Sequence, residues 1–139
     1  MILIGYSGHA FVVYGIFQSA GKQVSGYCDR EEKVINPFAL TYLGRESSKE
    51  ALSELEEHEF FIAIGDNQIR KNVYNELAKK RIQPVNAIHA SSVIDPSAKI
   101  AVNGVMVAAR VAINPLAVIG KGAICNTGCI IEHECVVGE

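Results

Sequence analysis

The sequence predicts an α/β domain with a parallel sheet, followed from near Ser91 by a triangular β-solenoid. Two observations carry this prediction. Short apolar runs alternate with helix-like segments up to about residue 90, and beyond it the apolar residues recur every six positions. With 139 residues, 49% of them hydrophobic and 20% charged, the chain is long enough to bury a core and lacks the composition of a disordered protein.

The first part of the chain alternates predicted strands and helices. Continuous apolar runs, typical of parallel strands buried on both faces, lie at residues 1–5, 24–28, 59–65 and 84–88. Helical character is found at residues 10–20, 47–55 and 68–80. Ser47 or Ser48 is the expected N-cap of the second helix, and Asp66 or Asn67 that of the third. This alternation favours a parallel sheet with right-handed connections.

The second part repeats with a period of six. An aliphatic residue or a cysteine opens each hexad, and Met106 is one extra residue that shifts the frame; the openings are residues 94, 100, 107, 113, 119, 125, 131 and 137. Neither a helix nor an amphipathic strand has this period, whereas three hexads per coil form a triangular solenoid. We therefore expect Ile113 to stack on Ile131, and Ile119 on Val137.

The chain stops at Glu139, in the middle of a hexad. A solenoid needs neighbouring coils or a cap at each end, and no capping helix or polar final repeat follows here. We therefore expect the chain to be a piece of a longer protein, with negligible catalytic activity by itself.

Charge and composition exclude several classes of partner. The chain has 13 Lys and Arg against 15 Asp and Glu, a net charge of −2, and no basic run of the kind that binds nucleic acid. No apolar stretch approaches the roughly 18–20 residues of a membrane span. The N-terminus has no basic region before its apolar run, so it predicts a strand rather than a signal peptide, and we expect a cytoplasmic protein.

The four cysteines fit neither a disulfide framework nor a standard zinc motif. Cys129, His133 and Cys135 are the one conceivable metal-binding group, but their spacing favours packing, and we expect no metal. Because Cys129 and Cys135 occupy the small-residue position of their hexads, we expect both to be buried and unreactive, and not to carry an acyl group.

The turn after the first strand is the expected phosphate-binding site. In parallel α/β sheets, the N–H groups at the start of the first helix face an anion at this point. Gly5 and Gly8 allow close approach of the backbone, Ser7 offers a hydroxyl, and His9 is a candidate for substrate contact. The turn lacks the Gly-x-Gly-x-x-Gly pattern, which speaks against an NAD-dependent enzyme.

Two further segments should border the same crevice. Asp29 ends the second strand, where an acidic residue commonly meets a ribose hydroxyl. Gly65, Asp66 and Asn67 follow the third strand at the same edge of the sheet, although Asp66 or Asn67 is also expected to cap the helix.

His133 is the candidate catalytic residue. Acetyl transfer from a thioester needs a base for the proton of the attacking amine or hydroxyl, and imidazole titrates in the suitable range. Regular alternation along a flat side of the solenoid would point His133 away from Glu132 and Glu134.

In its motifs the chain resembles the bacterial hexapeptide-repeat sugar acyltransferases, which include sialic-acid O-acetyltransferases and UDP-4-amino-sugar N-acetyltransferases. The resemblance rests on the Gly5–His9 turn with Ala10, the segment from Phe61 to Asn67 with Arg70, the Ile88-His89 link, and the hexads ending in Asn126–Glu139. It implies a Rossmann-like sugar-nucleotide domain over residues 1–90 and the start of a left-handed parallel β-helix over residues 91–139.

The resemblance also implies an activity. Acetyl-CoA would donate its acetyl group to the amine of a UDP-linked amino sugar in glycan biosynthesis, with His133 as general base and Glu134 as its orienting partner. The complete protein would be a homotrimer. Two alternatives stay open: an O-acetyltransferase of sialic acid or a related sugar, since the same base serves an amine or a hydroxyl, and a non-catalytic module that binds sugar nucleotides.

Overall fold

Four parallel strands form the sheet of the N-terminal part, in the order β3-β2-β1-β4. The computed structural model describes residues 1–139. The strand bounds are Ile2–Ile4 for β1, Gly26–Cys28 for β2, Thr41–Tyr42 for β3 and Phe60–Ile62 for β4. Strand β1 lies inside the sheet, between β2 and β4, and all three of its residues are buried. Strand β3 is a short edge strand that the apolar pattern did not predict.

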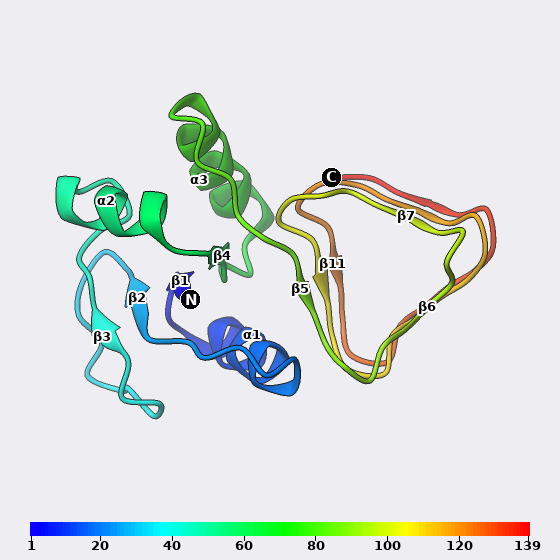
Figure 1. Cartoon of the computed structure of the whole chain (residues 1–139), viewed down its shortest axis with the longest axis horizontal. Coiled ribbons are helices and arrows are strands. Elements are labelled where there is room, and N and C mark those ends of the chain that lie inside the picture. Colours follow the sequence, from blue (N-terminus) through cyan, green and yellow to red (C-terminus); the bar gives the residue numbers. More distant parts are fainter.

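Three helices cover the two faces of this sheet. Helix α1 (Gly8–Ser19) lies on one face, and α2 (Lys49–Glu57) and α3 (Asn67–Lys79) lie on the other (Figure 1). Two of the predicted caps are confirmed: the Ser48 side chain accepts a hydrogen bond from Ala51 N, and the Asp66 side chain from Ile69 N. None of the helices has the length and the apolar surface that crossing a bilayer requires.

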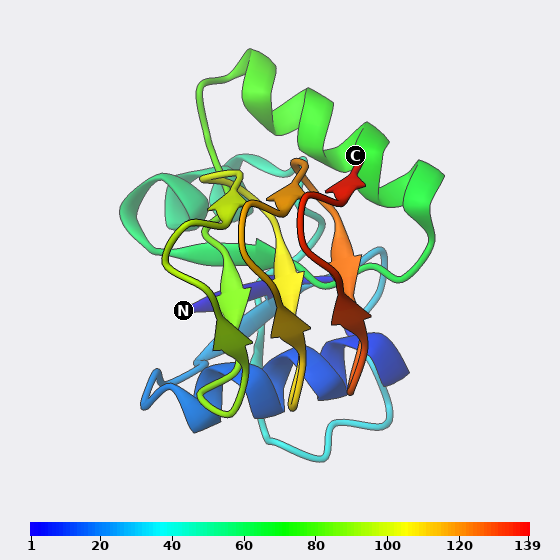
Figure 2. The same cartoon turned by 90° about the vertical axis from the view of Figure 1, so that its right-hand side faces the viewer.

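The C-terminal part is a left-handed parallel β-helix of two-residue strands. These strands form three parallel sheets, β11-β8-β5, β12-β9-β6 and β13-β10-β7. Figure 2 shows the coils side by side, with α3 above them and α1 below. The strands are β5 (Ala87–Ile88), β6 (Val93–Ile94), β7 (Lys99–Ile100), β8 (Met106–Val107), β9 (Ala112–Ile113), β10 (Val118–Ile119), β11 (Ile124–Cys125), β12 (Ile130–Ile131) and β13 (Val136–Val137).

The stacking predicted from the hexads is confirmed. Ile131 pairs with Ile113 and Val137 with Ile119, each one coil apart. Ile113 and Ile119, which have coils on both sides, are 2% and 1% exposed. The strand predicted at residues 84–88 was assigned to the wrong sheet, since β5 pairs with β8 of the solenoid and does not join the α/β sheet. The first coil therefore begins at Ala87.

The extra residue of the hexad pattern lies at the corner between β7 and β8. Successive strands of the solenoid start six residues apart, except for this pair, which starts seven apart. The amide of Asn86 holds the enlarged corner, because Nδ2 donates to Ala101 O at 2.7 Å and Oδ1 accepts from Val105 N at 2.9 Å. Gly104 of this corner lies against Tyr74 of α3. The enlarged corner is thus a point at which the solenoid packs against α3.

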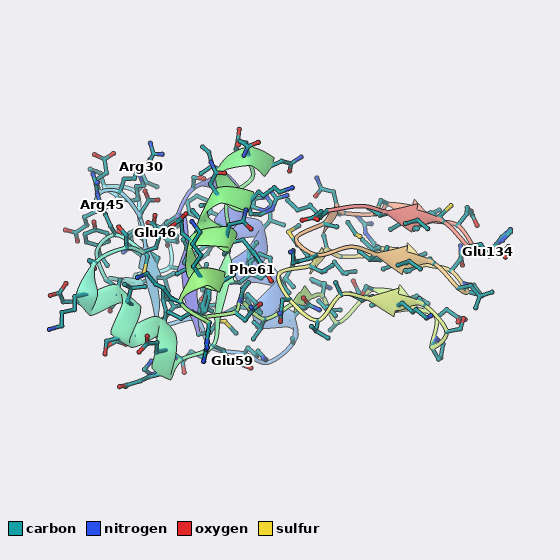
Figure 3. All side chains as sticks on the ribbon, turned by 90° about the horizontal axis from the view of Figure 1, so that it is seen from above. Arg30, Arg45, Glu46, Glu59, Phe61 and Glu134 are labelled. Atoms are coloured by element: carbon teal, nitrogen blue, oxygen red, sulfur yellow. The ribbon has the colours of Figure 1, made fainter.

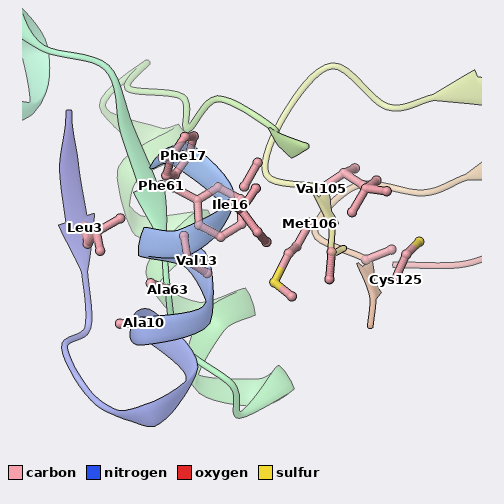
Figure 4. Close-up of a cluster of buried hydrophobic side chains, with 14 of the residues drawn as sticks. Leu3, Ala10, Val13, Ile16, Phe17, Phe61, Ala63, Val105, Met106 and Cys125 are labelled. Atoms are coloured by element: carbon pink, nitrogen blue, oxygen red, sulfur yellow. The ribbon is translucent and has the colours of Figure 1, made fainter. Parts of the chain in front are cut away.

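One buried core connects the sheet to the solenoid. Side chains from β1, α1 and β4 continue through Met106 to Cys125 inside the coils (Figure 4). Met106, on the strand that faces α1, is fully buried. The hydrophobic core is therefore continuous across residue 90, although the spacing of apolar residues in the sequence changes there.

Candidate active site

Two of the predicted loops meet at the carboxyl edge of the sheet. Gly5 has φ +87°, and a Cβ added there would lie 2.7 Å from Cγ1 of Ile64, at the end of β4. The His9 side chain packs on Gly65, where an added Cβ would lie 3.5 Å from the His9 Cβ. The structure therefore brings the Gly5–His9 turn and the loop of Gly65, Asp66 and Asn67 together, and we call the space they border the crevice.

Gly5 and Gly8 are expected to respond differently to alanine. Gly5→Ala forces a side chain into left-handed backbone and against Ile64, so we expect a loss of about 1–3 kcal/mol in the free energy of unfolding. An alanine at Gly8 meets nothing within 4 Å at the start of α1, so Gly8→Ala should not destabilise the fold. Urea unfolding of both variants checks this, and equal stabilities would contradict the geometry at Gly5.

His9 has an unused ring nitrogen beside the crevice. Its Nε2 atom is buried and has no hydrogen-bond partner. Burial lowers the pKa of His9, and the positive charge of Arg70 lowers it further, so the ring is neutral near pH 7. Ser7, the N-cap of α1, is exposed and makes no side-chain hydrogen bond to the helix. The Ser7 hydroxyl is therefore free to contact a ligand, whereas Nε2 of His9 is an unpartnered buried atom next to the crevice.

Asp29 is already engaged by its own chain. Its Oδ2 accepts a hydrogen bond from Tyr6 N at 2.9 Å, and its Oδ1 lies 3.2 Å from Nζ of Lys33. The carboxylate thus ties the end of β2 to the turn after β1. Asp29 therefore has a structural role at the turn after β1, and its contact with a ribose stays a prediction.

Arg70 lies beside the crevice and was not among the site residues predicted from the sequence. It is 9% exposed and lies one turn into α3, over the Asn67 side chain, whose Oδ1 accepts a hydrogen bond from its Nη2 at 2.7 Å. Burial lowers the pKa of Arg70, although the side chain stays charged near neutral pH. The sequence could have predicted that Arg70 lies next to Asn67, because residues three apart share a face of a helix and Arg70 follows Asn67 by three.

His133 and Glu134 lie in contact at a corner of the solenoid. The Nδ1–H of His133 donates to Oε2 of Glu134 at 3.1 Å, so Nε2 is the ring nitrogen left to accept a proton. The expectation that the two side chains point apart was wrong, because they occupy a corner and not a flat side. Glu134 has φ 58°, and left-handed residues recur at the equivalent corners, at residues 104, 110, 116, 122 and 128. The neighbouring carboxylate of Glu132 is held separately, by Nδ2 of Asn114 at 3.0 Å.

The histidine corner and the crevice are far apart within one chain. Sheet β11-β8-β5 faces the α/β part, whereas His133 lies between the other two sheets, after β12 and before β13. Figure 3 shows Glu134 at the end of the solenoid opposite to Phe61 and Arg45. A ligand in the crevice therefore cannot reach His133 of the same chain.

A cavity of about 320 Å³ lies beside the crevice, between α3 and the last coil. Asn67, Arg70 and Tyr74 line it from the helix, and Lys121 and Glu139 line it from the solenoid. His133 is not part of this cavity. No cluster of three or more His, Cys, Asp or Glu side chains with the geometry of a metal site is present.

The prediction that Cys129 and Cys135 are both buried was wrong. Cys129 is half-buried and Cys135 is exposed, because they belong to the last coil, on which no further coil stacks. Their equivalents one coil earlier, Val111 and Ala117, are buried.

The four thiols should differ widely in reactivity. Burial raises the pKa of the Cys28 thiol to about 12 and that of Cys125 to about 11. We expect iodoacetamide at pH 8 to modify Cys135 first in the folded 139-residue chain, and to reach Cys28 and Cys125 only after unfolding. Mass spectrometry of timed samples measures the order. Early modification of Cys28 in folded chain would contradict the burial described above.

Solved structures of sugar N-acetyltransferases share this architecture. Perosamine N-acetyltransferase from Caulobacter crescentus, as a histidine-to-asparagine variant in complex with CoA and GDP-perosamine, has a TM-score of 0.87 and 34% identity; the match covers 99% of this chain and 64% of that chain. PerB from the same organism, also with CoA and GDP-perosamine, has a TM-score of 0.84 and 36% identity, covering 97% and 63%. The present chain thus spans less than two thirds of these relatives.

The acetyltransferase domain of PglB from Neisseria gonorrhoeae FA1090, in complex with acetyl coenzyme A, has a TM-score of 0.83 over 99% of this chain and 66% of that domain. At 22% identity this likeness shows the fold alone. The sequence model of the PglD N-terminal domain matches residues 1–77, which are more than half of the chain. The chain therefore belongs to the family that carries the PglD N-terminal domain, as its resemblance to the hexapeptide-repeat sugar acyltransferases implied.

Proposed function

We propose that the chain is part of an acetyltransferase that moves the acetyl group of acetyl-CoA to the amine of a nucleotide-linked amino sugar. The observation that carries this proposal is the 34% identity with perosamine N-acetyltransferase over nearly the whole chain. The match includes both the crevice and the histidine corner, so both halves of the required chemistry have a counterpart here.

The proposed base is Nε2 of His133. It removes a proton from the sugar amine as the nitrogen attacks the thioester carbonyl carbon. A C–N bond forms, the C–S bond breaks, and the proton passes from His133 to the departing CoA sulfur. Glu134 holds the ring through Nδ1–H and stabilises its protonated form. The attack is direct, so no cysteine is needed as an acyl carrier.

The proposed sugar-nucleotide site is the crevice. The diphosphate would lie at the turn of Gly5, Ser7, Gly8 and His9, where the first N–H groups of α1 lack partners within the helix. The exposed Ser7 side chain, which makes no hydrogen bond to the helix, supports this placement. Asp29 would meet the ribose, and the loop of Gly65, Asp66 and Asn67 would border the opposite side of the ligand.

The distance between crevice and histidine favours a site shared between chains. We propose that the complete protein is a homotrimer, in which His133 of one subunit serves the crevice of a neighbour. Rows of exposed apolar side chains on the two outer sheets suit such contacts; they include Val93, Ile130, Val118 and Val136.

The nucleotide has two candidates. The family resemblance of the sequence favours UDP. GDP is the second candidate, because the similar perosamine N-acetyltransferase was solved with GDP-perosamine.

Thermal unfolding of the 139-residue chain with UDP, GDP, CMP or NAD tests the nucleotide site. A ligand at 100 times its Kd adds about 2.7 kcal/mol to stability, which is easily measured. We expect UDP or GDP to raise Tm and CMP and NAD to have no effect. A rise with CMP or NAD alone would contradict the proposed substrate class, and Gly8→Ala should remove the shift without lowering Tm in the absence of ligand.

A further inference from the structure

We propose that Arg70 is a positioning residue for sugar-nucleotide binding, which fixes the loop after β4 against the second coil of the solenoid. The inference rests on the proposed function of the crevice. It concerns a side chain that need not touch the ligand, because it acts through the loop of Gly65, Asp66 and Asn67.

All five N–H donors of the Arg70 guanidinium are used inside the protein. Nη1 donates to the carbonyl oxygens of Ile64 (3.0 Å) and Gly65 (3.1 Å). Nε and Nη2 each donate to Gly122 O at 3.2 Å, and Nη2 also donates to Oδ1 of Asn67 at 2.7 Å. None of these partners is a carboxylate. Removing the guanidinium charge from water costs free energy that offsets much of what these hydrogen bonds contribute, so a role in stability alone explains Arg70 poorly.

The bonds of Arg70 join segments that are distant in the chain. Gly122 lies 52 residues beyond Arg70, at the corner between β10 and β11, whereas Ile64 and Gly65 form the exit of β4. The planar guanidinium group of Arg70 thus connects the loop after β4 to the solenoid through hydrogen bonds. A lysine has its three donors on a single nitrogen and cannot span the same set of oxygens.

The same contacts orient the Asn67 amide. Because its oxygen accepts from Arg70, its NH₂ group is the free end, and it makes no hydrogen bond within the chain. An amide fixed with its donors outward suits a phosphate or a sugar hydroxyl. Without Arg70 the amide could rotate and present its oxygen, which would repel an anionic ligand.

The test compares Arg70→Lys with a control at another part of the same junction. Asn86→Ala removes the bonds to Ala101 and Val105 at the enlarged corner, which lies on the first coil. Calorimetric titration of the 139-residue chain with a UDP-linked and a GDP-linked amino sugar gives Kd. Amide exchange gives the opening of residues 64–68. Arg70→Lys should weaken binding about tenfold and accelerate exchange in this loop selectively, with exchange in β1 and β2 unchanged.

Several outcomes would overturn the inference. It fails if folded Arg70→Lys binds with the wild-type Kd and exchanges normally at residues 64–68, or if Asn86→Ala weakens binding as much. If Arg70→Lys does not fold, Asn67→Ala tests the amide that Arg70 orients, since it keeps the other four bonds of Arg70. Binding at the wild-type Kd would then contradict a positioning role that acts through Asn67. If the wild-type chain binds neither nucleotide, the proposed function fails, and the exchange data still show whether Arg70 holds the loop.

Discussion

Replacing His133 with alanine is expected to lower kcat/KM for acetyl transfer by the whole protein about 10²–10⁴-fold, the usual contribution of a general base. The Kd for the sugar nucleotide should stay within twofold, because the crevice holds the nucleotide and the proposed contact of His133 is with the amine of the acceptor sugar alone. Initial rates of CoA release measure the loss, and calorimetry measures the binding.

His58 supplies the matched control for His133. Like His133, it has an exposed ring next to a glutamate, since Nδ1 of His58 lies 3.4 Å from Oε2 of Glu54. It differs in its place in the fold, because it caps the C-terminus of α2 in the α/β part. His58→Ala should keep wild-type kcat/KM. If His133→Ala retains more than about a tenth of the wild-type rate, His133 is not the base.

Met106→Ala should cost about 2–5 kcal/mol of unfolding free energy, the range for truncating a fully buried side chain. Met106 lies where the solenoid packs on α1, so the loss should lower the midpoint of the whole chain in one cooperative transition. Met106→Leu, of similar volume, should cost less than about 1.5 kcal/mol. Calorimetry and circular dichroism follow both variants. Two separate transitions, with only one of them shifted, would show that the sheet and the solenoid do not share a core.

The solenoid could be predicted from the sequence in detail because its period is unlike that of any helix or strand. The partners Ile113 with Ile131 and Ile119 with Val137 follow from counting eighteen residues, and both pairs are found. The strand at Ala87–Ile88 could not be assigned by the same means. A short apolar run indicates that a segment is buried but does not indicate which strand it pairs with. The strand at Ala87–Ile88 pairs with β8 of the solenoid.

The crevice was predictable where it depends on topology. Strands β1 and β4 are neighbours, so the turns that follow them had to meet at one edge of the sheet. Arg70 was harder to foresee, because its role depends on Gly122, a contact across 52 residues. The resemblance implied Glu134 as the partner of His133, whereas the alternation of a flat side pointed the two side chains apart. The alternation was wrong for a local reason: a left-handed corner at Glu134 replaces the flat side.

The most direct test of the proposed activity is an acetylation assay with the whole protein, acetyl-CoA, and UDP- and GDP-linked amino sugars, with mass spectrometry of the product. We expect one acetyl group on the sugar nitrogen of a nucleotide-linked acceptor, and no product from the same sugar without its nucleotide. Acetylation of a hydroxyl group, equal rates on the free sugar, or no product with either nucleotide would contradict it.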